Sequence, residues 1–299
     1  MTTTAVRLRA SPRRLSVPHR TGALAQLLRT KPLGAIGAAI ILVLLIAAIG
    51  APWLAPYPYD VGVAGVRLQG PSLAHPFGTD ANGRDLLSRI IWGARVSVTI
   101  GFGAVAISTV LAICVGVLCG YFGGWFDLLV QRVVDVWISF PALVLLVSLV
   151  AILGPGLFST TLILGILLAP GTSRVVRSAV LGMRHLPYVE SARCAGAGHI
   201  RIIRACVLPN VSATIIVLAT IQLGAAILAE STLSFLGYGV PPPYPTWGAM
   251  LSGTGRAFML QSPWLSVWPG LAISAAVFGF NMLGDALRDI LDPRLGRGS

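Results

Sequence analysis

The sequence predicts an all-α membrane protein with six transmembrane helices. Of its 299 residues, 55% are hydrophobic and only 11% are charged, whereas a soluble domain carries about 25% charged residues. The apolar residues form long uncharged runs, which are typical of membrane spans. Most of the 22 basic residues lie before the first run, around a central polar loop or after the last run. Basic residues gather on the cytoplasmic side of a membrane, so this distribution accounts for the net charge of +12 without a nucleic-acid partner.

The first apolar run covers residues 33–54 and follows a basic segment, residues 1–32, that we expect to be cytoplasmic. A cleaved signal peptide would place its apolar stretch nearer the start, with a small-residue cleavage site behind it. The run is long enough for one span of about 20 residues. We therefore predict an uncleaved first transmembrane helix that runs outward, followed by an external segment that reaches residue 94.

The external segment contains a polar stretch, residues 77–85, followed by apolar residues at helical spacing over 86–91. This pattern predicts a short amphipathic helix on the outer membrane surface. From their chemistry alone, we expect Asp80 to cap the start of a helix, and Arg84 and Asp85 to form a solvated ion pair.

The second span is predicted over the uncharged run 96–126, and the third over about 136–153. Since a charge at the bilayer centre costs about 2.5–3.5 kcal/mol or more, we place Arg132 and Asp135 at the cytoplasmic interface as an i, i+3 pair. A proton-relay role for Asp135 is less favoured, because no second intramembrane carboxylate accompanies it. Pro141 should kink this helix.

Three more spans complete a core that we place at residues 95–290. The predicted spans four, five and six cover about residues 157–172, 211–229 and 265–283. Span five should end at Glu230 on the outer side. The following segment, residues 231–264, is broken by prolines and glycines, so we expect an external, partly re-entrant loop rather than a span. Residues 291–299 would form a cytoplasmic tail.

The central polar loop, residues 184–210, is predicted to form two helices joined by a sharp bend. Gly196 and Gly198 end the first helix, because glycine adopts backbone angles that other residues avoid. A second short helix should cover 199–208, and Pro209 cannot continue it without a kink. Three apolar residues of this second helix would share one face: Ile200, Ile203 and Val207.

This loop also matches, by its spacing, a motif of the membrane subunits of ATP-driven importers. The matching residues are Glu190, Ser191, Ala192, Gly196, Leu208 and Pro209. Ser191 stands in place of the first alanine of the usual Glu-Ala-Ala, and Cys206 in place of a usual isoleucine. The resemblance implies that the loop docks into a groove on an ATPase subunit. A basic loop resting on anionic lipid headgroups is the alternative, which the fixed spacing of six positions disfavours.

Further motifs extend the resemblance over nearly the whole chain from the first span onward. The external residues Gly78, Thr79, Asp80, Gly83, Arg84 and Asp85 resemble a signature of dipeptide and oligopeptide importer permeases. The stretches 230–239, 245–248 and 281–294 resemble further signatures of that family. The chain thus resembles the C-type permease subunits of dipeptide, oligopeptide and nickel ABC (ATP-binding cassette) importers.

The resemblance implies a type I ABC importer permease fold with cytoplasmic coupling helices, in the cytoplasmic membrane of a prokaryote. The implied partners are a homologous second permease in a heterodimer, two cytoplasmic ATPases that hold ATP and Mg, an external solute-binding protein and membrane lipid. Lys31 is the chain's one lysine, and Pro32 follows it, so the chain lacks a phosphate-binding loop with Lys and Ser or Thr. We therefore expect a non-catalytic subunit that binds no cofactor and no metal, with both termini cytoplasmic.

Peptides are the expected solute, with nickel or a metal chelate as the alternative. A potassium channel is a distant alternative, because only Gly237-Tyr238-Gly239 resembles a selectivity filter. An intramembrane serine protease needs a histidine near a serine within the membrane, and no histidine falls in a predicted span. The sequence therefore favours a peptide importer subunit, moving its solute by alternating access.

Overall fold

The computed structural model describes residues 32–291, so the predicted basic segment and tail lie almost wholly outside the described residues. The regular elements within this range are all helices. Five are long and apolar enough to cross a membrane, and the bent pair α4–α5 brings the number to six if it counts as one span. The spanning helices are α2 (Pro32–Leu54), α3 (Leu86–Phe122), α4 (Gly124–Ser139), α5 (Ala142–Leu153), α6 (Leu157–Met183), α9 (Leu208–Phe235) and α12 (Trp264–Leu291). The predicted all-α membrane fold is confirmed.

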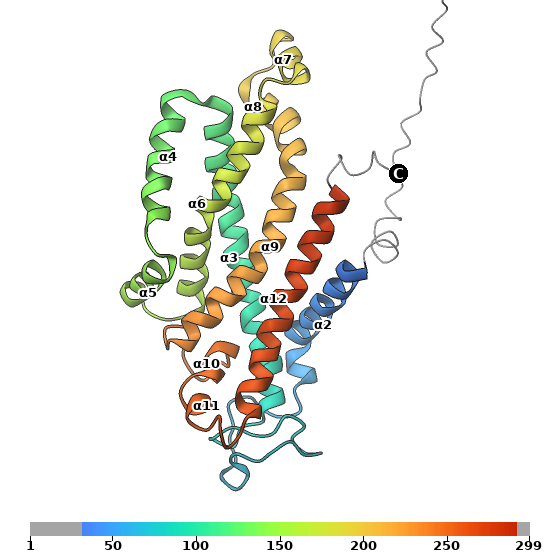
Figure 1. Ribbon diagram of the computed structural model, residues 1–299, viewed down its shortest axis with the longest axis vertical. Helices are drawn as coiled ribbons and strands as arrows, with labels where there is room; N and C mark the ends of the chain where they lie inside the picture. The colour runs from blue at the N-terminus through green and yellow to red at the C-terminus, as the bar shows by residue number, and fades with distance from the viewer. Residues whose placement is uncertain (1–31, 292–299) are drawn as a thin grey trace, which may run out of the picture.

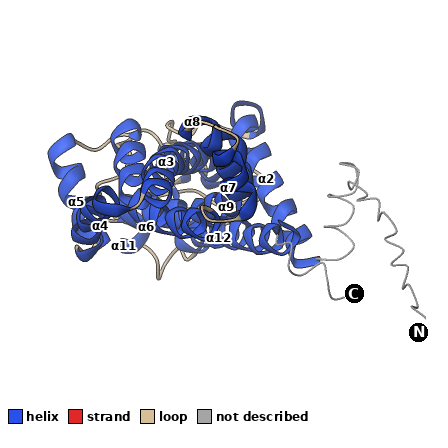
Figure 2. Cartoon of the chain, turned by 90° about the horizontal axis from the view of Figure 1, so that it is seen from above, coloured by secondary structure: helices blue, strands red, loops and turns tan. Residues whose placement is uncertain are grey.

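Helix α3 is the central element of the bundle and packs along α6, α2 and α9, while α12 lies against α2 and α9 (Figure 1). Figure 2 shows α4 and α5 on one side of the bundle and α2 on the other. One apolar core joins α2, α3, α9, α10 and α12, with Trp247 and Phe280 almost fully buried in it. The start of α2 and the end of α12 point toward the same end of the bundle as residues 184–210 (Figure 1), as an even number of crossings requires.

The predicted amphipathic surface helix is not a separate element. Residues 86–91 form the first turns of α3, which continues without a break to Phe122. Leu86 is buried in the core, and the indole of Trp247 donates a hydrogen bond to the Ile90 carbonyl at 3.0 Å. The apolar spacing that indicated a surface helix is the buried face of a longer helix, so the predicted boundary at residues 94 and 95 divides α3.

The third span is broken rather than kinked. Helices α4 and α5 meet at 90°, at the predicted position beside Pro141. Phe140 has an extended backbone (φ −80°, ψ 141°), because proline disfavours the α conformation in the residue before it. Arg132 and Asp135 do form the predicted i, i+3 pair, at 3.8 Å, and Asp135 also pairs with Arg174 of α6.

The end of the fifth span also differs from the prediction. Helix α9 continues past Glu230 to Phe235, and Glu230 is fully buried inside it. The chain then folds back through two short helices, α10 (Trp247–Leu251) and α11 (Thr254–Ala257), before α12 begins. Helix α10 packs against α9 and α12, so part of the 231–264 segment belongs to the protein core.

Candidate functional site

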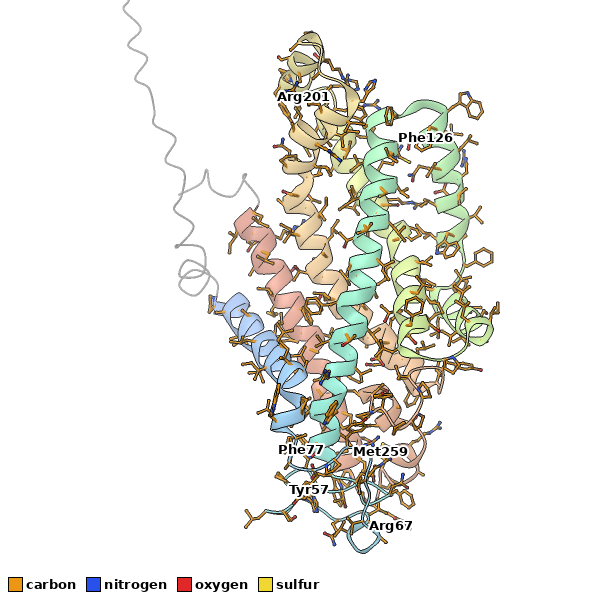
Figure 3. All side chains as sticks on the ribbon, turned by 180° about the vertical axis from the view of Figure 1, so that it is seen from behind. Tyr57, Arg67, Phe77, Phe126, Arg201 and Met259 are labelled. Carbon is orange, nitrogen blue, oxygen red and sulfur yellow. The ribbon has the colours of Figure 1, made fainter. Side chains whose placement is uncertain are left out.

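Residues 184–210 form the tip of one end of the molecule, as the place of α7 in Figure 1 and of Arg201 in Figure 3 shows. Helix α7 (Pro187–Cys194) starts with a proline at its first position, where the missing N–H costs nothing. It ends at Cys194, and Gly196, two residues later, has a φ of +78°. The N–H groups of Gly196 and Ala197 bond to the carbonyls of Arg193 and Ala192 at 2.9 and 3.0 Å, which is a common glycine C-cap. The predicted bend at Gly196 is confirmed.

The second helix of this segment is not a separate short helix. Helix α8 (His199–Ile202) passes through a π-helical turn (Ile203–Val207) directly into α9, which has Pro209 in its first turn. The Leu208 N–H bonds to the Ile203 carbonyl, five residues back. Such a turn relieves the clash between a proline ring and the carbonyl four residues before it, so the helix accommodates Pro209 and continues.

The π turn also changes which residues face the core. Ile202, Val207 and Val211 are buried, whereas Ile200 is 70% exposed. The predicted face of Ile200, Ile203 and Val207 is therefore wrong for Ile200. One extra residue in the turn shifts the register, so Ile202 and Val207, five positions apart, point the same way.

The buried side of the segment rests on α3 and α6. Val189, Ile202 and Val207 pack in one apolar cluster with Val180 of α6 and Tyr121 of α3. The Tyr121 hydroxyl lies 3.0 Å from His199 Nδ1, and the guanidinium of Arg193 lies 5.5 Å from the centre of the Tyr121 ring. The segment is thus packed against α3 and α6. The sequence did not predict the contact with Tyr121, because Tyr121 lies about 80 residues away in the chain.

The outer side of the segment faces solvent. Of the six residues in the matched motif, Glu190, Ser191, Gly196 and Pro209 are exposed, and Ala192 and Leu208 are partly buried. The first four motif residues lie together on α7 and its C-cap, whereas Leu208 and Pro209 lie at the start of α9. The Ser191 hydroxyl bonds only to its own helix, at the Pro187 carbonyl. Helix α7 is thus packed against the bundle on one side and exposed on the other.

The second motif, residues 78–85, differs from α7 because its polar side chains bond within the chain. Asp80 Oδ1 accepts hydrogen bonds from the N–H groups of Asn82 and Arg84 at 2.8 and 2.9 Å, and Oδ2 accepts one from Arg84 Nε at 2.8 Å. Arg89 Nε lies 3.6 Å from the same carboxylate. Thr79 is fully buried, with its hydroxyl donating to the Val66 carbonyl. The six motif residues form a compact hydrogen-bonded cluster at the N-terminus of α3, which we call the 78–85 knot although the chain is not threaded.

The structure exchanges the roles predicted for the two aspartates. Asp85, not Asp80, caps α3, since its Oδ2 accepts from the Ser88 N–H at 2.8 Å and from the Ser88 hydroxyl at 2.7 Å. Arg84 pairs with Asp80 rather than with Asp85. His75 Nδ1 lies 2.9 Å from Asp85 Oδ1, a partner that the sequence did not reveal. The motif is therefore structural, and it fixes the segment between α2 and α3 to the bundle.

A polar cluster inside the bundle was not predicted. The Glu230 carboxylate accepts hydrogen bonds from the hydroxyls of Ser234 at 2.7 Å, Ser97 at 3.2 Å and Ser231 at 3.4 Å. This cluster joins α9 to α3 beneath the loop that leads to α10. Among the described residues, His, Cys, Asp and Glu do not gather in any group of three that could hold a metal ion.

Comparisons with known proteins agree with these features. The model of a family described as "binding-protein-dependent transport system inner membrane component" matches residues 112–297, and one described as "N-terminal TM domain of oligopeptide transport permease C" matches residues 24–71.

Three relatives are similar over most of their length. The chain is 42% identical to the dipeptide transport system permease protein DppC of Alkalihalophilus pseudofirmus, over 90% of this chain and 88% of that one. It is 41% identical to the di/tripeptide transport system permease protein DppC of Pseudomonas aeruginosa, over 88% of each chain. It is 39% identical to the glutathione transport system permease protein GsiD of Escherichia coli, over 89% and 88%.

Among solved structures, a chain of the inward-facing MetNI methionine ABC transporter superposes with a TM-score of 0.56. The superposition covers 68% of this chain and 96% of that one at 20% identity. At this identity the likeness concerns the fold alone.

Proposed function

This chain belongs to the family of inner-membrane components of binding-protein-dependent transport systems, and we propose that it moves di- and oligopeptides across the cytoplasmic membrane of a prokaryote. It is a permease subunit of an ABC importer, with the helical fold of such subunits. The observation that carries the proposal is helix α7 at one end of the membrane bundle. One side of α7 is packed against the bundle, and its other side is exposed and available to a partner protein.

The proposed complex contains four further proteins. A homologous second permease completes the membrane part as a heterodimer, and an external solute-binding protein delivers the peptide. Two cytoplasmic ATPase subunits bind ATP and Mg and perform the hydrolysis, so this chain holds no cofactor and catalyses no reaction. Both of its termini and the 184–210 segment lie on the cytoplasmic side, and the 78–85 knot lies outside.

The 184–210 segment is the proposed coupling element. Helix α7, with Glu190, Ser191 and Ala192, rests in a groove of one ATPase, and Gly196 forms the bend beside it. When ATP draws the two ATPases together, α7 moves with its subunit. Its apolar seat on Tyr121 and Val180 passes that motion to α3 and α6, and the bundle alternates between inward-open and outward-open states.

Peptides are the proposed solute because the relatives are named for the transport of dipeptides, di/tripeptides and glutathione. A nickel ion or metal chelate is the other outcome to test. The two are separated by measuring ATP hydrolysis of the reconstituted five-protein complex in nanodiscs, against a panel of short peptides and nickel chelates. Stimulation by peptides alone supports the proposal, and stimulation by chelates alone contradicts the solute assignment.

The coupling role has its own test in the same assay. Glu190→Lys reverses the exposed charge of α7, and Gly196→Pro forbids the positive φ of the bend. We expect both variants to lose at least about tenfold of the peptide-stimulated hydrolysis, since a docking defect of about 1.4 kcal/mol suffices for that. Asp285→Lys is the matched control, because it reverses another exposed carboxylate near the same end of the bundle. Unchanged stimulation in both coupling variants contradicts the assignment.

A further inference from the structure

A groove opens where the bent pair α4–α5 meets α6 and α9. It has a volume of about 380 Å³, within the range of small-ligand sites. Its lining includes Trp137 and Phe140 of α4 and its C-cap, Ala142 of α5, Leu168 and Thr172 of α6, and Gln222 of α9. The 90° bend creates it, because residues on both sides of the break contribute to the same wall.

The wall on the α4 side is held in place at both ends. Asp127 of α4 makes two hydrogen bonds of 2.5 Å to the guanidinium of Arg177 on α6, and Asp135 pairs with Arg174 one turn away. On the other side of the bend, Leu146 and Val150 of α5 are buried in a core cluster with α3 and α6. The groove is therefore a preformed feature of the fold.

Gln222 places an amide group near the middle of α9, deep in a membrane-spanning helix. Its Nε2 donates to the Thr172 hydroxyl and, at 3.4 Å, to the Leu168 carbonyl, while its Oε1 accepts from the Ser108 hydroxyl at 3.4 Å. Both N–H groups and one lone pair of the amide thus have partners, but the two bonds of 3.4 Å are long and weak, so a peptide group can replace them. Gln222 is also only partly buried, at the surface of the groove. Polar groups at such depth are costly to expose to lipid and mark solute paths.

We propose that this groove is a section of the peptide translocation path, where Gln222 forms hydrogen bonds with the main chain of the passing peptide. The inference rests on the proposed function. An amide presents a donor and an acceptor together, which matches a peptide group. Trp137 and Phe140 supply apolar contact for side chains. The lining contains no Asp, Glu, His, Cys, Lys or Arg, so the groove favours uncharged side chains and offers a nickel ion no favourable ligand.

Peptide uptake by proteoliposomes that hold the complete importer tests the role of Gln222. We expect Gln222→Leu to reduce uptake of labelled dipeptides about tenfold, the effect of one lost hydrogen bond to the solute, and Gln222→Asn to restore part of it. Thr220→Val is the matched control and should transport normally, because the Thr220 hydroxyl bonds to its own helix at the Ile216 carbonyl. Purified complexes must show equal subunit stoichiometry, which excludes an assembly defect as the cause.

Thiol labelling tests whether the peptide occupies the groove. In a background without the four native cysteines, Gly171→Cys places a thiol in the lining and Gly182→Cys places one elsewhere on α6; an added Cβ meets no atom within 4 Å at either position. We expect a dipeptide with its binding protein and ATP to slow labelling at position 171 severalfold and not at position 182.

The outcomes separate the two proposals. Peptide uptake by the wild-type complex with no effect of Gln222→Leu, or with no protection at position 171, overturns the groove assignment alone. A thiol at position 171 that is blocked with and without peptide also overturns it, since the second permease then covers the groove. Absence of peptide uptake by the wild-type complex overturns the proposed function and this inference with it.

Discussion

The 78–85 knot and the 184–210 segment lie at opposite ends of the same bundle (Figure 3), and their polar residues have opposite surroundings. In the knot, the Asp80 and Asp85 carboxylates are buried and accept hydrogen bonds from within the chain. On α7, the Glu190 carboxylate is exposed and has no partner among the described residues. Both regions resemble family motifs in their spacing, yet only in the knot do the carboxylates bond to other groups of the described chain.

The difference indicates that the two motifs serve different purposes, one within the fold and one toward another molecule. A buried polar group without a partner costs about 1–3 kcal/mol, so the knot requires each of its residues for the fold. An exposed group has water as a partner and carries no such requirement. Helix α7 is packed on one side, and on its exposed side the Glu190 carboxylate has no partner among the described residues. This arrangement is consistent with the intermolecular role proposed for α7. Substitutions in the knot should reduce stability, and those on α7 should reduce coupled activity.

The largest expected effect comes from the glycines, because each region contains one with positive φ. Gly83 has φ +75°, and a Cβ there would lie 2.0 Å from the Val63 carbonyl oxygen. Gly196 has φ +78°, but a Cβ there would meet no atom within 4 Å. We expect Gly83→Ala to cost about 4 kcal/mol, through backbone strain and steric overlap together. Gly196→Ala should cost about 1 kcal/mol, through strain alone.

Chemical denaturation of the purified complex in mixed micelles, followed by tryptophan fluorescence, measures both values. The control is Gly65→Ala, in the external segment, where an added Cβ also meets open space. If Gly83→Ala and Gly196→Ala lower the free energy of unfolding equally, the distinction between a packed knot and an open loop is contradicted.

The next effect concerns the seat beneath α7. Ile202 is 1% exposed and Ile200 is 70% exposed, two residues apart in α8. Ile202→Ala should destabilise the protein by about 3 kcal/mol, as expected for a large-to-small change in a core, and Ile200→Ala by at most about 0.5 kcal/mol. The same denaturation assay compares them. A larger loss at Ile200 would restore the face predicted from a regular helix and contradict the π turn.

These two isoleucines also illustrate what the sequence predicts well and what it does not. Long apolar runs fix the existence of the spans, and α2 agrees with its predicted run almost to the residue. Register within a helix depends on an unbroken 3.6-residue period. A π turn adds one residue to that period, and it forms here where Pro209 must be accommodated inside a helix. Hydrophobic spacing assumes a regular helix, so it places Ile200 on the buried face and misses the shift.

The candidate site shows the same limit in its hydrogen bonds. The positions of the motifs were evident from the sequence, because spacing is a local property. Partner choice is not local: Asp80 takes Arg84 and Arg89, while Asp85 takes Ser88 and His75. Glu230 was expected to end a helix, yet its burial beside Ser97 of another helix decides its role. Such contacts across elements appear only when the helices are packed.

The smallest expected effect distinguishes the two regions by their carboxylates. Asp85→Ala removes the cap of α3 and the acceptor of the buried Ser88 hydroxyl, so we expect a loss of about 2 kcal/mol in the free energy of unfolding. Glu190→Ala removes an exposed and unpaired group, so the free energy of unfolding should change by no more than about 0.5 kcal/mol, while peptide-stimulated hydrolysis of ATP falls. Denaturation and ATP hydrolysis are measured on the same preparations, so that each variant has both a free energy of unfolding and a stimulated rate of hydrolysis. If Glu190→Ala loses as much stability as Asp85→Ala, the Glu190 carboxylate supports the fold of this chain, and a docking role for it is contradicted.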